Sequence, residues 1–302
     1  MSNLSIKLKR ELVKGLAKLG LRQVKSDYLG MPLRVPVVQG VVNSGFIVPA
    51  ELWMGQCLKT FLETKAGAVI DIGVNAGVYL VKLRQLSTER EYIGFEPNPS
   101  CNLYTQELIR LNQFEAARIF PVALSDNTGT ARFYATEIGD KTGSLVYEHK
   151  AHEPLDHSFD VVTNTGDEML NLLKPQDICA IKIDVEEAEL FVLRGLSTTI
   201  DRHRPYIYCE VIAPDGDKTR EQRTQEIYQL VTSKDYAVLG VRKDRPLLTQ
   251  VDTASAFGAG FEQEYIFCPA ECVEPFCNTI KHNATEITVD VAQKTNTLKA
   301  TS

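Results

Sequence analysis

The sequence of 302 residues lacks several features, and each absence excludes a class of protein. No apolar run approaches the roughly 18 to 20 residues that a membrane-spanning helix needs, and the N-terminus has no signal-peptide core. Basic residues are not in excess, since 33 Lys and Arg stand against 39 Asp and Glu for a net charge of -6. That balance disfavours general binding to nucleic-acid phosphates. We therefore expect a cytoplasmic protein that does not bind nucleic acid.

Paired-cysteine motifs are also absent. The number of cysteines is odd, at seven. Several lie in segments that look like strands or helices, which is typical of reduced, buried thiols and not of a disulfide framework: Cys57, Cys101, Cys179 and Cys209. The other three, Cys268, Cys272 and Cys277, lie close together. Their C-x3-C-x4-C spacing matches neither the usual zinc sites nor the C-x3-C-x2-C of radical-generating iron-sulfur clusters. We predict no metal there.

The sequence does contain enough apolar residues, 44%, for a large core. It also alternates strand-like and helix-like segments, a pattern that requires a mostly parallel sheet with helices on both faces. The expected strands are 68–72, 91–95, 118–122, 178–183, 206–211, 236–241 and 263–268, and the expected helices lie near 77–86, 99–112, 187–195 and 220–233. The prediction is an α/β Rossmann-like fold with a seven-stranded, mostly parallel sheet.

Three regions are expected along the chain. Residues 1–65 form a helical and irregular extension that packs on the core, residues 66–277 form the main domain, and residues 278–302 form a loosely held tail. The main domain carries an insertion at 124–176, where substrate selection usually resides. Residues 4–22 have the spacing of a basic amphipathic helix. Such a helix usually packs on its own domain or on a dimer mate, and the alternative is contact with an anionic membrane.

The most informative segment runs from Val69 to Gly77 and reads Val-Ile-Asp-Ile-Gly-Val-Asn-Ala-Gly. It predicts a buried parallel strand, a glycine turn and the start of a helix. Gly73 and Gly77 can adopt backbone angles closed to other residues and allow a ligand to approach the main chain. The next strand ends at Glu96, whose carboxylate can accept hydrogen bonds from both hydroxyls of a ribose. The segment therefore predicts a nucleoside site.

The ligand class follows from two residues of this turn. A dinucleotide site predicts G-x-G-x-x-G, but Asn75 occupies the place of the middle glycine. Asp71 adds a negative charge just before the turn, where two phosphates would be repelled. A cationic ligand is favoured, and S-adenosylmethionine fits because it carries a sulfonium and an ammonium. We expect Asp71 to hold the ammonium through water or backbone groups.

Other polar residues are expected to complete the cofactor site. Asn98 should lie near Glu96, and Ser125 with Asp126 should lie at the edge of the adenine, after the third strand. An alternative for Asp126 is that it caps the turn at 127–129.

Several spaced motifs resemble those of the FkbM family of S-adenosylmethionine-dependent methyltransferases, over about residues 66–212. The matching segments are Ile70–Gly77 (I-D-I-G-x-N-x-G), Phe95–Pro99 (F-E-P-N-P), Ala123–Gly129 (A-L-S-D-x-x-G), Lys182–Gly195 (K-I-D-V-E-G-x-E-x-x-V-L-x-G) and Pro205–Glu210 (P-x-x-x-x-E). The resemblance implies the class I methyltransferase fold. It also implies methyl transfer to a hydroxyl, commonly on a sugar or a polyketide-like product.

Two positions depart from the family pattern. Glu187 stands where the motif V-E-G has its glycine, so the helix start after the fourth strand gains a negative charge, and a close backbone approach is not expected there. Residues 165–170 read Thr-Gly-Asp-Glu-Met-Leu where the family often has T-L-D-D-L-L. This segment keeps the acidic pair but loses a leucine, so the substrate side is expected to differ.

Carboxylates at strand ends are the candidates for catalysis. A sulfonium is an activated methyl donor, so positioning supplies much of the rate, on the order of 7 to 11 kcal/mol. A base that takes the proton of the acceptor adds about 100- to 10,000-fold. Asp184 and Glu186 follow the fourth strand and Glu210 ends the fifth, while strand alternation points Lys182 to the side of Asp184.

The sequence leaves the role of these strand-end carboxylates open. A base or a binder of the substrate hydroxyl is preferred for Asp184, Glu186 and Glu210. A hard-metal site made of oxygen ligands and a structural ion pair with Lys182 or Arg194 are the alternatives. Histidines of the insertion, His149, His152 and His157, are either a base that swings over the acceptor or surface residues.

The preferred function is O-methylation of a hydroxyl on a small molecule or glycan, either a saccharide or a secondary metabolite. The first rival is an NAD(P)-dependent oxidoreductase, which Asn75 disfavours, as does the lack of a tyrosine-lysine pair at helical spacing after the fourth strand. The second is a non-catalytic nucleoside-binding assembly subunit, to which Glu187 gives some support. The acceptor and the oligomeric state leave no mark in the sequence.

Overall fold

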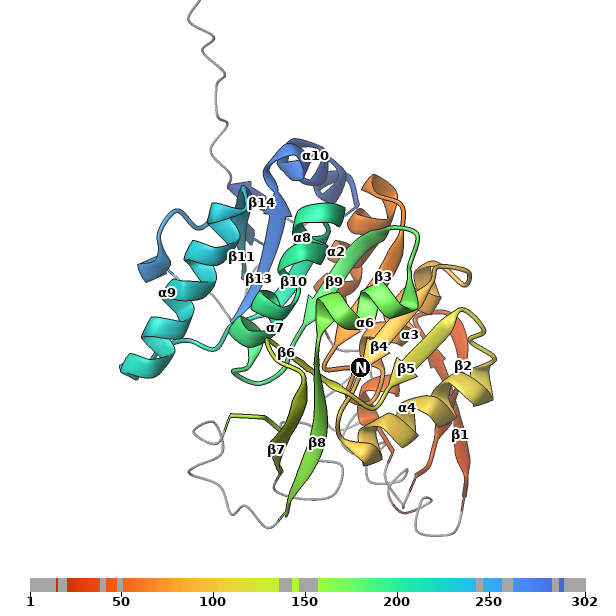
Figure 1. Cartoon of the computed structure of the whole chain (residues 1–302). Coiled ribbons are helices and arrows are strands. Elements are labelled where there is room, and N and C mark those ends of the chain that lie inside the picture. The colour runs from red at the N-terminus through yellow and green to blue at the C-terminus, as the bar shows by residue number, and fades with distance from the viewer. Residues whose placement is uncertain are drawn as a thin grey trace, which may run out of the picture.

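The computed structural model describes residues 21–38, 42–47, 51–135, 143–146, 157–242, 247–256, 263–283 and 288–290, together with Gly15. Within these residues the largest sheet has nine strands, in the order β14-β12-β11-β13-β10-β9-β3-β4-β5 (Figure 1). Their bounds are β3 (Ala68–Ile72), β4 (Tyr92–Phe95), β5 (Ala117–Phe120), β9 (Ile178–Ile183), β10 (Tyr206–Glu210), β11 (Tyr236–Arg242), β12 (Leu247–Gln250), β13 (Glu264–Pro269) and β14 (Thr288–Asp290).

The centre of this sheet has the predicted parallel arrangement. β5, β4, β3, β9 and β10 run parallel, and β13 lies antiparallel between β10 and β11. All seven predicted strands are present in the sheet, which confirms the Rossmann-like α/β fold. β12 and β14 extend the sheet beyond β11 and were not predicted. The central strands are buried along their whole length, which explains why β3 and β9 are apolar apart from Asp71 and Lys182.

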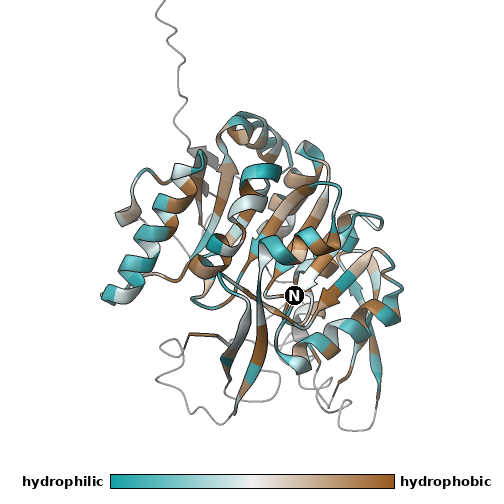
Figure 2. Ribbon diagram, in the orientation of Figure 1, coloured by the Kyte–Doolittle hydropathy of each residue, from teal (hydrophilic) through white to brown (hydrophobic). Residues whose placement is uncertain are grey.

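Helices cover both faces of the sheet. One hydrophobic core joins the sheet to α6 (Gly166–Leu173), α7 (Glu189–Gly195), α8 (Ser197–His203) and α9 (Lys218–Ser233). The core on the other face joins it to α2 (Leu52–Thr64), α3 (Val78–Leu86) and α10 (Val273–Asn283). In Figure 1 the helices α6, α7 and α8 lie in front of the sheet and α2 lies behind it. Hydrophobic residues concentrate on the strands, and α9 is largely hydrophilic (Figure 2).

Side-chain caps fix several helix ends close to where the sequence predicts them. α4 (Pro99–Asn112) begins after Asn98, whose side chain accepts a hydrogen bond from the Ser100 N–H at 3.0 Å. Asp217 caps α9 in the same way, through the N–H groups of Thr219 and Arg220. The predicted helices near 77–86, 99–112, 187–195 and 220–233 are therefore confirmed within two residues. The sequence did not predict α6, α8 and α10.

The segment from 124 to 176 contributes a second sheet beside the main one. It has the order β6-β8-β7, formed by β6 (Ala123–Ser125), β7 (Gly129–Ala135) and β8 (His157–Thr165). β7 and β8 lie within the insertion expected at 124–176. A short piece, residues 143–146, lies against β7 because Ser144 pairs with Tyr134. His149 and His152 lie outside the described residues.

The remaining elements sit at the two ends of the described chain. A hairpin of β1 (Gln23–Tyr28) and β2 (Met31–Pro36) packs on α4, and short 3-10 helices lie at η1 (Ser44–Phe46), η2 (Ala254–Ala256) and η3 (Ala270–Cys272). Most of the predicted helix at 4–22 is outside the described residues. α10 continues past residue 277 to Asn283.

Two global features concern the described part of the chain. No helix in it is both long and apolar enough to cross a membrane. Cys268 and Cys277 are buried, and neither they nor Cys272 belong to a cluster of three or more potential metal ligands among the residues that the structure places.

Candidate active site

A pocket opens at the carboxyl ends of the parallel strands β3, β4, β9 and β10. Its polar lining comes from the residues that follow these strand ends, and its apolar lining comes partly from β7 and from residues 143–146. The residues that line the pocket include Gly73, Asn75, Glu96, Val122, Ala123, Leu124, Phe133, Leu145, Asp184, Val185, Glu186, Ala188 and Glu210. In doubly wound folds this edge of the sheet is where ligands bind.

Glu96 is held rigidly at the end of β4. One carboxylate oxygen accepts the N–H of Asn75 at 2.7 Å and the other accepts the N–H of Asn98 at 2.8 Å. The residue is 6% exposed. Burial raises the pKa of Glu96 to about 7, although the two backbone donors oppose the rise. The result is a fixed carboxyl group whose remaining lone pairs can accept hydrogen bonds from a ligand.

The glycine turn between β3 and α3 has three left-handed residues, Gly73, Asn75 and Gly77, with φ values of 81°, 54° and 82°. A Cβ atom on Gly73 would lie 1.8 Å from the carbonyl oxygen of Asp184. Gly73 is therefore required because β3 and the turn after β9 touch. Gly77 packs against Leu108 of α4 and is not part of the pocket lining.

Asp71 lies beneath the pocket and not in its wall. Its side chain is 0% exposed and accepts a 2.6 Å hydrogen bond from the hydroxyl of Tyr92. Its other oxygen is 3.5 Å from Nζ of Lys182. Asp71 does not line the pocket, and the register of β3 and β9 places it opposite Lys182 inside the sheet. The expected role of Asp71, holding a ligand ammonium through water or backbone groups, stays a prediction.

Lys182 connects this buried layer with the pocket. Its Nζ atom lies 3.0 Å from Oδ2 of Asp184 and donates a 2.7 Å hydrogen bond to the carbonyl of Gly73. Burial alone would lower the pKa of Lys182, but the carboxylates of Asp184 and Asp71 outweigh burial and raise it above its ordinary value. Lys182 is thus a permanent cation behind the pocket wall.

All three of the predicted catalytic carboxyl groups line the pocket: Asp184, Glu186 and Glu210. The side chain of Asp184 is 34% exposed and is paired with Lys182. Burial, together with the neighbouring Asp184 carboxylate, raises the pKa of Glu210 to about 9. Near neutral pH Glu210 is therefore neutral and can donate a hydrogen bond, and it lies beside the Asp184 carboxyl group that pairs with Lys182.

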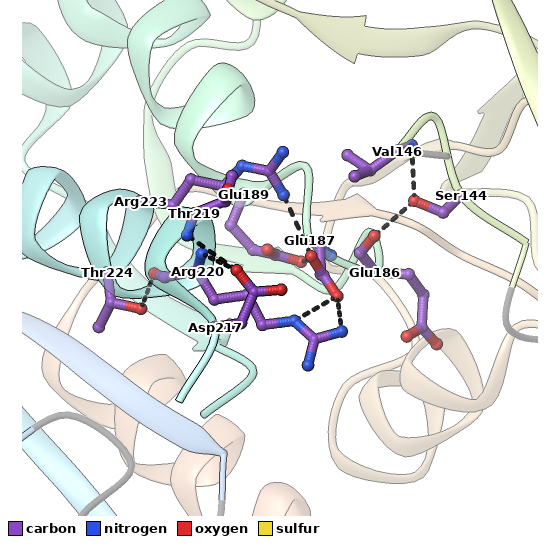
Figure 3. A network of polar contacts seen from close by, with 10 residues as sticks. All are labelled: Ser144, Val146, Glu186, Glu187, Glu189, Asp217, Thr219, Arg220, Arg223 and Thr224. Atoms are coloured by element: carbon purple, nitrogen blue, oxygen red, sulfur yellow. Dashed lines mark hydrogen bonds and ion pairs between the residues drawn. The ribbon is translucent and has the colours of Figure 1, made fainter. Parts of the chain in front are cut away.

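The turn after β9 brings these groups into place. Glu186 and Glu187 both have left-handed backbones, with φ values of 56° and 78°. The Glu187 side chain points toward Arg220 and Arg223 of α9 (Figure 3). Glu189 accepts the N–H groups of Val185 and Glu187, both at 3.2 Å, and burial raises its pKa to about 8. Glu187, which stands where the family motif has glycine, therefore has the left-handed backbone that a glycine adopts readily.

The structure places Ser125 and Asp126 just outside the pocket. Ser125 is buried under α7, where a Cβ on Gly195 would lie 2.0 Å from its carbonyl oxygen. Asp126 is exposed and accepts a hydrogen bond from the side chain of Asn127 at 3.1 Å. Its place at the adenine edge and its alternative role as the cap of the turn at 127–129 both stay predictions. Instead, the three residues before Ser125 line the pocket: Val122, Ala123 and Leu124.

Sequence reasoning missed the apolar side of the site. Phe133 and Leu145 line the pocket, and the Ser144 hydroxyl donates a hydrogen bond to the carbonyl of Glu186 (Figure 3). Phe133 carries a signal only in the alternation of β7. Leu145 carries none, because it lies in a polar segment whose position depends on tertiary contacts.

The fold is a Rossmann-like α/β fold, and its pocket lies at the carboxyl ends of the parallel strands. The family described as the methyltransferase FkbM domain matches residues 71–238, which is more than half of the chain. The chain belongs to this family.

Other comparisons give more distant similarities. No curated protein sequence matches the chain. A crystal structure of methyltransferase FkbM from Methylobacillus flagellatus KT is 15% identical with a TM-score of 0.42, covering 67% of this chain and 43% of that one. The precorrin-6y C5,15-methyltransferase from Geobacter metallireducens GS-15 is 9% identical with a TM-score of 0.39, covering 72% and 87%. M. jannaschii TYW2 in complex with AdoMet is 12% identical with a TM-score of 0.38, covering 81% and 83%.

Proposed function

We propose that this protein is an S-adenosylmethionine-dependent methyltransferase that methylates a hydroxyl of a saccharide or secondary metabolite. The observation that carries the proposal is the position of Glu96. It is buried, fixed by two backbone N–H groups, and faces the same pocket as Asp184 and Glu210. A ribose binder and a proton acceptor therefore share one cavity.

The residues present fit the methyl donor. Glu96 offers acceptor oxygens for ribose hydroxyls, and Val122, Ala123 and Leu124 offer an apolar wall for an adenine ring. Among the described residues that line the pocket, none is a lysine or arginine, whereas four carry carboxyl groups: Glu96, Asp184, Glu186 and Glu210. A cationic nucleoside is favoured over a pyrophosphate-bearing dinucleotide by this charge distribution, which argues against the oxidoreductase alternative.

The reaction needs little covalent chemistry from the protein. When bound, S-adenosylmethionine supplies an activated methyl group. Asp184, which is paired with the Lys182 ammonium, accepts the proton of the acceptor hydroxyl, a role that contributes about 100- to 10,000-fold. Glu210, neutral near pH 7, donates a hydrogen bond that orients the acceptor or Asp184 itself.

The apolar side of the pocket supports this chemistry by excluding water. Phe133 and Leu145 reach it from the insertion, and Val185 and Ala188 reach it from the turn after β9. A drier pocket strengthens the interaction between Asp184 and an approaching hydroxyl. Because Gly143 and Leu145 line the pocket, residues 143–146 are a part of the insertion that can contact the acceptor.

Two measurements test the proposal. Calorimetry with S-adenosylmethionine, S-adenosylhomocysteine and NADP should detect binding of the first two and not of the third. Transfer of a labelled methyl group to a panel of glycans and hydroxylated metabolites should then identify the acceptor class. Binding without turnover on any acceptor would favour the non-catalytic assembly subunit, and binding of NADP alone would refute the proposal.

The Asp184→Asn variant separates chemistry from binding. It removes the proton acceptor while keeping the size of the side chain, so turnover should fall about 100-fold or more, with S-adenosylhomocysteine affinity within about threefold of wild type. Asp160→Asn is the control, because Asp160 forms an exposed ion pair with Arg132 away from the pocket. A wild-type rate in Asp184→Asn would remove Asp184 from the mechanism.

A further inference from the structure

The turn that carries Asp184 has an unusual backbone. Glu186 and Glu187 are consecutive left-handed residues, and the φ value of 78° at Glu187 is one that glycine adopts far more readily than any residue with a side chain. A glutamate at this position must be held by contacts that outweigh the conformational penalty.

Such contacts are present on α9. The carboxylate of Glu187, with its side chain 3% exposed, receives Nε of Arg220 at 2.8 Å and Nη1 of Arg223 at 3.1 Å. Nη2 of Arg220 lies 2.6 Å from the same oxygen as Nε, so this arginine binds with two nitrogens. Figure 3 shows both arginines converging on Glu187 from the first turns of α9. Buried, charge-assisted pairs of this kind hold their geometry well.

The start of α9 is itself fixed. The carboxylate of Asp217 accepts the N–H groups of Thr219 and Arg220 at 2.8 and 3.2 Å. Arg220 is thereby placed in the first turn of a capped helix. On the opposite side of the turn, the Ser144 hydroxyl bonds the Glu186 carbonyl (Figure 3). The pocket-lining residues Asp184, Val185 and Glu186 thus lie between two anchors.

We infer that Glu187 is a positioning residue: its ion pairs with Arg220 and Arg223 hold the turn at Asp184–Glu186 in the left-handed form that shapes the pocket. Glu187 does not line the pocket. It acts on the site through the backbone, and it makes the geometry of the site depend on α9. The expected effect on ligand binding rests on the proposed function.

Two replacements of Glu187 should affect the turn differently, because glycine relieves the backbone penalty and glutamine does not. Glu187→Gln keeps the Cβ atom and its backbone penalty but removes the charge, so the turn should loosen. Glu187→Gly removes both the ion pairs and the penalty, so the turn should keep its shape without the arginines. Arg220 and Arg223 have side chains 26% and 19% exposed, so both can be hydrated after the change.

The experiment compares Glu187→Gln, Glu187→Gly, the double variant Arg220→Gln with Arg223→Gln, and that double variant combined with Glu187→Gly. Amide hydrogen exchange in the ligand-free protein follows the N–H groups of Val185 and Glu187, and calorimetry follows S-adenosylhomocysteine. Arg194→Gln is the control, because Arg194 joins α7 to α9 through Glu226 away from this turn.

Glu187→Gln and the arginine double variant should speed exchange and weaken binding about tenfold, which corresponds to about 1.4 kcal/mol. Glu187→Gly should stay within about threefold of wild type, and adding the arginine changes to it should have no further effect. A Glu187→Gly variant as impaired as Glu187→Gln would overturn the inference, and so would wild-type exchange in Glu187→Gln. If the wild-type protein binds no S-adenosylhomocysteine, the proposed function fails, while the exchange rates still decide the role of Glu187.

Discussion

Replacing Glu96 by glutamine is the sharpest test of nucleoside recognition, because it changes one atom of a fixed carboxyl group. Both oxygens of Glu96 accept a backbone N–H, from Asn75 and from Asn98. Whichever way the new amide is oriented, its NH2 group faces one of these donors. The variant therefore loses a buried hydrogen bond as well as the charge.

The size of the effect follows from the number of bonds lost. A hydrogen bond to a charged group contributes about 1.5 to 3 kcal/mol. Losing one such bond to a ribose hydroxyl should weaken S-adenosylhomocysteine binding about 10- to 150-fold. The disrupted backbone contact should lower the free energy of unfolding by a similar 1.5 to 3 kcal/mol, about the range for a charged hydrogen bond. Calorimetry and urea denaturation measure the two quantities separately.

The pH dependence of binding gives an independent check. Since burial raises the pKa of Glu96 to about 7, the carboxyl group is mostly neutral at pH 6 and mostly ionised at pH 8. The ionised form is the better acceptor for ribose hydroxyls, so affinity should increase about tenfold from pH 6 to pH 8. In Glu96→Gln this increase should disappear.

Glu91→Gln is the matched control for Glu96→Gln, because Glu91 precedes the same strand and its side chain forms an exposed ion pair with Arg118. It should leave binding unchanged and cost at most about 1 kcal/mol of stability. If Glu96→Gln bound within threefold of wild type and kept the same pH slope, recognition of a ribose by Glu96 would be refuted.

Two further predictions concern stability. Gly73→Ala and Gly77→Ala share the left-handed penalty of about 1 to 2 kcal/mol, but only at Gly73 does the new Cβ meet backbone, 1.8 Å from the Asp184 carbonyl. Urea denaturation should therefore give Gly73→Ala an additional loss of about 3 kcal/mol or more, and equal losses would contradict the close approach. Separately, the free energy of unfolding should fall between about pH 5 and pH 9, because burial raises the pKa of Glu96, Glu189 and Glu210 to about 7, 8 and 9. Raised pKa values stabilise the folded chain fully below the ordinary glutamate value, and that stabilisation is lost as pH rises through each folded value. Glu189→Gln should flatten the slope, and a stability that rises over this window would contradict the assignment.

The central sheet could be predicted from the sequence because its strands are buried on both faces. Runs such as Ile178–Ile183 are apolar apart from one lysine, and turn residues separate them from helical segments. β14 escaped prediction because it has only three residues, and β12 escaped because its sequence Leu-Leu-Thr-Gln shows neither alternation nor a continuous apolar run. α8 escaped because its sequence Ser-Thr-Thr-Ile-Asp-Arg-His has little helical preference of its own, and packing of Ile200 holds it.

The candidate site could be predicted only in part. Parallel strands end at one edge of the sheet, so Glu96, Asp184 and Glu210 were predicted to meet there, and they line one pocket. The position of Asp71 could not be read in the same way, because it depends on the register that sets it opposite Lys182. The pairing of Glu187 with Arg220 and Arg223 joins residues 33 and 36 positions apart and follows from the path of the chain.

The titratable residues of the site lie in two layers with different roles. In the lower layer, Lys182 lies between Asp71 and Asp184, so a cation is fixed behind the pocket wall and pairs with both side chains. In the upper layer, Glu96 and Glu210 have raised pKa values because the pocket removes them from water. A cation entering the pocket would favour their ionised forms and lower both pKa values. Burial of these carboxyl groups therefore has two effects: it destabilises the folded protein at high pH, and it favours binding of a cationic methyl donor. Replacing Glu96 by glutamine should weaken both the loss of stability at high pH and the binding of the donor.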